Sequence, residues 1–319
     1  MKNNQYLSKE HTNCLRGIFA IVVIIHHLYQ YTRLFSGTLL GEFLQLSGSL
    51  AVAMFFFFSG YGLMFSANKK NYIQNFFRNR FLPLYCFYIV LVVLYSLWTL
   101  LLERSISPKW VIQSFFFGNT VVTNGWYLQV IFVLYLLYLL IFKIFKSPKI
   151  QILLFGIASV FYMALGFWLH LNVWWYQTVF CMVFGMVYCY KKDMINIILA
   201  KYAWEIFILT GILFTRIDMI NGVSVLFYTV FSLFFICFVL SFSYILHDTP
   251  IINNSFFSLC GKYSLELYVS HGFFLRLIKL NIIENKFIYI FVVIVGTIVM
   301  SAIMKKVYIK ITNLFSKPQ

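Results

Sequence analysis

The stretch LRGIFAIVVIIHHLYQYTR, residues 15–33, has the length and apolar composition of a helix that crosses a lipid bilayer. Arg16 lies at its start, and His26 and His27 lie side by side in its interior. An ionisable side chain in hydrocarbon costs at least a few kcal/mol, so each is a functional candidate by default. Because no small-residue cleavage site follows, we expect a retained first span rather than a signal peptide.

Helix geometry separates the two histidines. Arg16 and His27 are 11 residues apart, which is within about 20° of whole turns, so they share one face about 16 Å apart along the axis. His26 is turned about 100° away from His27. Arg16 fits the role of an anchor at the membrane interface, and His27 fits that of a hydrogen-bonded residue between helices. They also fit proton-transfer chemistry, for which histidine is well suited near neutral pH.

The composition predicts an all-α integral membrane protein. The chain is 62% hydrophobic and 11% charged, whereas soluble domains are roughly 45–50% apolar and about 25% charged. We expect one transmembrane domain over residues 1–319 and no soluble domain. The net charge of +16 comes from Lys and Arg in short connections, a pattern typical of membrane topology. Membrane lipids are therefore expected partners, and nucleic acid is not.

About ten transmembrane helices are predicted, because a span needs about 20 apolar residues. Their approximate ranges are 15–33, 44–66, 81–103, 126–146, 150–168, 173–190, 202–217, 223–246, 263–283 and 287–304. An even number places both termini on one side. Connections on that side hold 18 Lys and Arg, and those on the other side hold 5. The positive-inside rule then predicts that both termini are cytoplasmic.

Small and basic residues surround the second connection. In FFFFSGYGLMFS, residues 55–66, Ser59 and the glycines interrupt an apolar run, which favours close helix packing. Arg78 and Arg80 follow, shortly before Pro83 at the start of a helix. Guanidinium groups bind phosphate in a bidentate manner, so this pair is a candidate phosphate-binding site.

Further candidates lie in the fourth and ninth spans. Trp126 begins the fourth. In GKYSLELYVSH, residues 261–271, Glu266 and His271 are five residues apart, or about 140° around a helix. They cannot point in one direction, although both could line one cavity. The six cysteines form no C-x-x-C pair, and we expect no metal site.

Taken in order, these features resemble the acyltransferase-3 family of bacterial membrane O-acyltransferases, which modify cell-envelope sugars. The family's first helix has an arginine, ten residues and a histidine, matched by Arg16 and His27. The phrases FFFFSGYGL, RFLP with Arg80, WYL with Trp126 and SLELYVSH with His271 match later family motifs. The resemblance covers nearly the whole chain and implies a ten-span core.

Two positions depart from the family pattern. Members often carry R-x-x-R before the proline, but Phe77 stands three residues before Arg80 here. Members also commonly carry an acidic residue soon after the fourth-span tryptophan, where this chain has Gln129 and Val130. The chain has no extracytoplasmic hydrolase-like domain of the kind found in some longer members.

The resemblance implies an enzyme that moves an acyl group, most simply acetyl, from acyl-coenzyme A to a hydroxyl of a glycan or lipid-linked sugar. It implies a multi-pass protein of the bacterial plasma membrane. His27, Arg16 and Glu266 would be catalytic, and Arg16, Arg78 and Arg80 would hold the coenzyme A phosphates. Trp126, His271 and Ser59 would contact the substrates.

Other functions stay open on the sequence. The main alternative is a glycan exporter or flippase without covalent chemistry, since buried charges and aromatic-lined spans suit transport as well. A polysaccharide polymerase is disfavoured, because no large extracytoplasmic loop is visible. A purely structural membrane protein is the remaining alternative.

Overall fold

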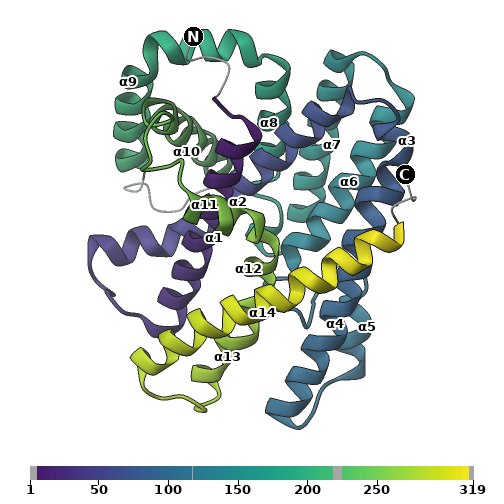
Figure 1. Ribbon diagram of the computed structural model, residues 1–319, viewed down its shortest axis with the longest axis vertical. Coiled ribbons are helices and arrows are strands. Elements are labelled where there is room, and N and C mark those ends of the chain that lie inside the picture. Colours follow the sequence, from purple (N-terminus) through teal and green to yellow (C-terminus); the bar gives the residue numbers. More distant parts are fainter. Residues whose placement is uncertain (1–5, 117, 218–224, 316–319) are drawn as a thin grey trace. The chain divides into compact units, whose positions relative to one another are not determined.

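The computed structural model describes residues 6–116, 118–217 and 225–315, without the side chains of 214–217. The predicted connection after the seventh span, the side chain of Arg216, the first residues of the predicted eighth span and both chain ends lie outside this description. Every regular element in the described residues is helical (Figure 1). The predicted all-α class is confirmed.

The helices follow one another in a single series. They are α1 (Lys9–Thr32), α2 (Leu39–Ala67), α3 (Tyr72–Phe76), the π-helix η2 (Phe77–Phe81), α4 (Leu82–Glu103), α5 (Pro108–Ser114), α6 (Trp126–Ile144), α7 (Pro148–Trp168), the 3₁₀-helix η3 (Val173–Trp175), α8 (Phe180–Tyr190), α9 (Lys192–Ile217), α10 (Val225–Ile245), α11 (Ser255–Lys262), α12 (Ser264–Ser270), α13 (Gly272–Lys279) and α14 (Lys286–Phe315). Prolines occupy the first turns of α4, α5 and α7, where no backbone N–H is needed.

Eight helical segments in the described part of the chain are long and apolar enough to cross a membrane. They correspond to eight of the ten predicted spans. The predicted span 173–190 instead contains η3 and the 11-residue α8, and 263–283 divides into α12 and α13. The 11 residues of α8 reach only about 16 Å, roughly half the hydrocarbon thickness, and α12 and α13 are shorter still.

The chain forms two compact units, each built from three stretches. Unit 1 comprises Met1–Val23, Leu46–Lys69 and Phe145–Lys262. Within it, α10 packs against α9 and α8, and α7 packs against α8. A Cβ at Gly60 of α2 would collide with the Met182 carbonyl of α8, and one at Gly185 would collide with the Phe57 carbonyl. The predicted packing role of the FFFFSGYG stretch is therefore confirmed at Gly60.

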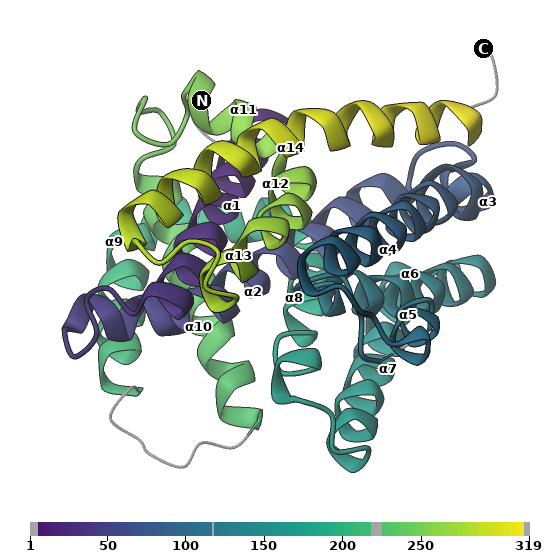
Figure 2. The ribbon, with the colours of Figure 1, turned by 90° about the horizontal axis from the view of Figure 1, so that it is seen from below.

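Unit 2 comprises Ile24–Gln45, Lys70–Ile144 and Tyr263–Gln319. Its long helix α14 runs beside α12, α13 and α4 (Figures 1 and 2). The π-helix η2 packs against α4 and α6. The break between α12 and α13 falls at His271, and Gly272 follows it. A Cβ at Gly272 would collide with the Tyr95 hydroxyl, so glycine lets α13 begin against α4.

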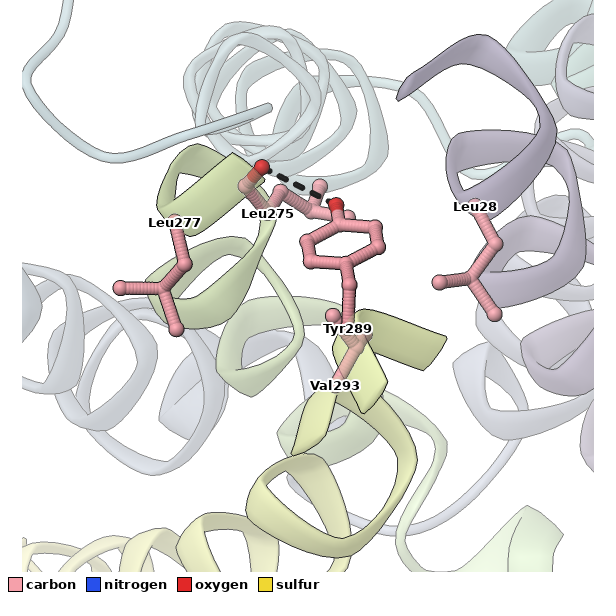
Figure 3. Packing of buried hydrophobic residues seen from close by; sticks show 5 residues of the cluster. All are labelled: Leu28, Leu275, Leu277, Tyr289 and Val293. Atoms are coloured by element: carbon pink, nitrogen blue, oxygen red, sulfur yellow. Dashed lines mark hydrogen bonds between the residues drawn. The ribbon is translucent and has the colours of Figure 1, made fainter. Parts of the chain in front are cut away.

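A hydrophobic cluster holds one end of unit 2 together. Figure 3 shows Leu28 of α1, Leu275 and Leu277 of α13, and Tyr289 and Val293 of α14. The hydroxyl of Tyr289 donates to the Leu275 carbonyl over 3.0 Å, so its polar group is satisfied inside the cluster. The cluster fixes the C-terminal parts of α1 and α13 relative to the start of α14.

Candidate active site

His27 lies on α1 in unit 2, and both of its ring nitrogens have partners. Nδ1 is 2.8 Å from Oε1 of Gln30, one turn later on the same helix. Nε2 is 3.0 Å from Nδ2 of Asn124. His27 is partly exposed, whereas His26 and His271 are buried. Of these three histidines, His27 has the largest exposed fraction.

Asn124 is held in the connection that precedes α6. Its φ of 60° is in the left-handed region, which asparagine adopts more readily than most residues. The Tyr268 hydroxyl donates to the Asn124 carbonyl over 2.7 Å, fastening this backbone to α12. The Asn124 carboxamide thereby points at His27 and, at 3.4 Å, at Nε2 of His271.

His271 stands at the break between α12 and α13. It is 0% exposed, and its Nδ1 is 3.2 Å from the Leu267 carbonyl. Its ring stacks on that of His27, with centroids 5.1 Å apart and planes inclined by 22°. The two predicted histidines, far apart in sequence, are thus neighbours in one cluster.

These partners define one tautomer for both imidazoles. An amide nitrogen only donates and a carbonyl oxygen only accepts. Nε2 of each ring therefore accepts from Asn124, and Nδ1 carries the proton that goes to Gln30 or to Leu267. Both rings are neutral in this arrangement. Nε2 of His27 is the basic nitrogen, which can take a proton from a hydroxyl that displaces the amide.

Gln129 secures the connection that carries Asn124. It is 3% exposed. Its Nε2 donates to the Phe116 carbonyl over 2.7 Å and to the Tyr88 hydroxyl over 3.0 Å, and its Oε1 accepts from the Gly118 N–H. The uncharged amide, which replaces the family's common acidic residue, both donates and accepts. A carboxylate could not make the donated bonds.

Arg78 and Arg80 are exposed on the π-helix η2 of unit 2. Nε of Arg78 donates to the Phe315 carbonyl near the end of α14, over 2.9 Å. Arg80 lies close enough to Tyr308 of α14 to interact electrostatically with it, and no acidic side chain among the described residues forms an ion pair with it. π-Helical segments of this kind are rare and are frequently found at functional sites.

Arg16 and Ser59 lie in unit 1. The Arg16 guanidinium lies over the Phe58 ring, 5.6 Å from its centroid, and NH2 is 3.4 Å from the Phe58 carbonyl. The Ser59 hydroxyl donates to the Phe55 carbonyl of its own helix over 2.8 Å. Arg16 therefore contacts α2 at the predicted motif, and Ser59 has its donor engaged within that helix.

Glu266 and Trp126 take other positions in unit 2. Glu266 is 1% exposed, and its Oε1 is 3.2 Å from Nζ of Lys305 on α14. No histidine in the described part of the chain bonds to it. Trp126 is the first residue of α6, two residues after Asn124, and contacts Tyr127 edge-on.

Three residues near His27 show what sequence reasoning found and missed. The Leu44 carbonyl lies 2.7 Å from Nδ1 of His26, so His26 and His27 have different partners, as helix phase predicted. Asn124 and Gln30 were not predicted. The Asn-Gly pair before Trp126 indicates a turn, but nothing local indicates that its amide meets a histidine. The described residues contain no group of three or more His, Cys, Asp or Glu side chains that could hold a metal ion.

A family model described as an acyltransferase domain matches residues 12–306. The match includes α1 with Arg16 and His27, η2, Asn124 and the break at His271. Comparisons with curated proteins and with solved structures found no match. Because the family model covers most of the 319 residues, this chain belongs to the acyltransferase-3 family and is a membrane acyltransferase.

Proposed function

We propose that this acyltransferase is an O-acyltransferase that moves an acetyl or similar acyl group from acyl-coenzyme A to a hydroxyl of a cell-envelope or exported glycan. The observation that carries the proposal is the contact between Asn124 and Nε2 of His27, because it makes that nitrogen the base. We place the protein in the bacterial plasma membrane as a single transmembrane acyltransferase domain.

The proposed chemistry begins at Nε2 of His27. The acceptor hydroxyl displaces the Asn124 amide and gives its proton to Nε2, and its oxygen attacks the thioester carbonyl carbon. The C–O ester bond forms, the C–S bond breaks, and the imidazolium returns the proton to the coenzyme A thiolate. The displaced amide can then donate to the oxyanion that develops on the carbonyl.

His271 and Gln30 position the base in this proposal. Gln30 accepts from Nδ1–H of His27, which keeps the lone pair on Nε2, and stacking on His271 restricts ring rotation. Trp126, His271 and Ser59 remain proposed substrate contacts on the basis of the family motifs. Of these, His271 is the one that contacts His27 directly.

We propose that Arg78 and Arg80 bind the coenzyme A phosphates. Arg80 is exposed and forms no ion pair with an acidic side chain among the described residues, and a guanidinium makes charge-assisted bonds to phosphate. Arg16, 11 residues before His27 on α1, stays a proposed coenzyme A contact, as the family motif implies. We further propose cytoplasmic termini and ten crossings, with η3–α8 and α12–α13 as broken spans, because the positive charges are distributed accordingly.

The test is transfer of labelled acetyl from acetyl-coenzyme A by the purified full-length chain in lipid nanodiscs, with isolated envelope glycan as acceptor. We expect the label to appear as an ester on the glycan. An exporter or flippase would move glycan across vesicles without consuming acetyl-coenzyme A. That result would contradict the proposal.

A further inference from the structure

An open groove of about 350 Å³ lies in unit 2 and is lined by Gln30, Tyr31, Ile278 and Lys279. Its volume is at the lower end of small-molecule sites, which measure about 300–1,000 Å³. Tyr31 and Ile278 also pack against the hydrophobic cluster formed by Leu28, Leu275, Leu277, Tyr289 and Val293. Gln30 and Lys279 supply its polar groups.

The groove reaches the base of the proposed reaction through Gln30. The Oε1 atom of this residue accepts the Nδ1 proton of His27. Gln30 is also a wall of the groove. A molecule in the groove therefore touches the side chain that orients His27, and His27 is itself partly exposed.

The groove carries an uncompensated positive charge. Helix α13 has two basic residues. Arg276 is neutralised by Glu103 at 2.5 Å, and it also donates to Thr99. Lys279 is exposed, and no acidic side chain in the described part of the chain pairs with it. An ammonium beside an amide and a tyrosine attracts a hydroxylated ligand that carries an anionic group.

We propose that this groove is part of the acceptor site and that it takes the anionic group of an acidic sugar, whose carboxylate or phosphate pairs with Lys279 beside Gln30, on the Nδ1 side of His27. The inference rests on the proposed function, because it assigns the groove to the acceptor of that reaction. It adds the charge class of the acceptor and the helix ends at which it binds, the C-terminal ends of α1 and α13.

The test measures how fast an amine-specific acetylating reagent labels Lys279 in the purified full-length chain, with mass spectrometry as the readout. The probes are methyl glucuronoside, glucose 6-phosphate and the neutral methyl glucoside. Near saturation, at about ten times the dissociation constant, an anionic probe should slow labelling about tenfold, because only the empty fraction reacts. Lys286, an exposed lysine that does not line the groove, is the internal control.

Each outcome decides the inference. Protection of Lys279 by either anionic probe, with methyl glucoside inactive and Lys286 unchanged, supports it, and the two anionic arms separate carboxylate from phosphate. Equal protection by methyl glucoside, or no protection by either anionic probe, overturns it. The readout needs no turnover. Acyl transfer without protection therefore overturns the groove assignment alone. Protection without acyl transfer overturns the proposed function, and leaves the groove as an anion-binding site without an acceptor role.

Discussion

His27 and His271 form a stacked pair with ring centroids 5.1 Å apart, and the Asn124 carboxamide lies within 3.4 Å of Nε2 of both rings. One amide thereby sets the protonation of two imidazoles. The partly exposed ring has the basic nitrogen, and the buried ring supports it. This asymmetry leads to the first two predictions.

Replacing His27 with Ala should abolish acyl transfer, with a rate loss of about 10²–10⁴-fold or more, because the proton acceptor is removed. The His26→Ala variant is the matched control. It loses a hydrogen bond to the Leu44 carbonyl, which costs about 1 kcal/mol of stability, and it should remain active. Labelled acetyl transfer and membrane yield are measured for both. Retained transfer in His27→Ala would rule out His27 as the base.

Changes at Asn124 should alter turnover more than stability. Asn124→Gly keeps the left-handed backbone without strain and removes the amide, so kcat should fall while KM for acetyl-coenzyme A stays close to wild type. Asn124→Asp replaces a donor with an acceptor, which favours a proton on Nε2 of His27 and removes the free lone pair. It should be the less active variant. If the two variants lose the same activity and the same folding stability as each other, the role of Asn124 is purely structural.

The close approach of α2 and α8 can be tested with a pair of glycines two residues apart. Gly60→Ala places a methyl group against the Met182 backbone and should destabilise unit 1 by about 1–3 kcal/mol. At Gly62 the nearest atom, NH2 of Arg16, is 3.8 Å from the new methyl position. Gly62→Ala should therefore be tolerated. Thermal unfolding in detergent compares the two, and similar melting temperatures would contradict the packing argument.

Variants of the ion pair between Glu266 and Lys305 distinguish a structural role of Glu266 from a chemical one. Lys305→Met leaves a carboxylate buried at 1% exposure and should destabilise unit 2 by about 3–5 kcal/mol. The double variant Glu266→Leu/Lys305→Met removes both charges and should recover most of that stability. Glu266 is a predicted catalytic residue that contacts Lys305 rather than His27, and acyl transfer by a stable double variant would show that this role is wrong. A stable but inactive double variant would make Glu266 part of the chemistry.

Much of the fold was predictable because it depends on local chain properties. Long apolar runs predict membrane helices, and eight of the ten predicted ranges correspond to long helices in the described residues. Of the two exceptions, 173–190 is an apolar run without charged residues, whereas 263–283 contains Glu266, Arg276 and Lys279. The glycine at position 272 depends on neighbours, because Tyr95 and Thr123 leave no room there for a Cβ.

The site was predictable only in part. The Arg16 and His27 motif follows from spacing along one helix, and His271 from a later motif. Asn124 lies 97 residues from His27, and no periodicity connects the two. Gln129 was noticed only as a departure from the family, although it bonds to the connection that holds Asn124 in place.

The sequence by itself determined that this chain is a helical membrane protein and that Arg16 and His27 share a helix face, since helix periodicity and hydropathy are local properties. The order of its motifs and the family-model match identify the acyltransferase-3 family. Only the tertiary structure decided which groups meet His27. The Tyr268 hydroxyl fixes the Asn124 backbone, and Asn124 in turn fixes the tautomer of His27. These contacts join segments that are distant in the chain, so they exist only after α1, α6 and α12 have packed together.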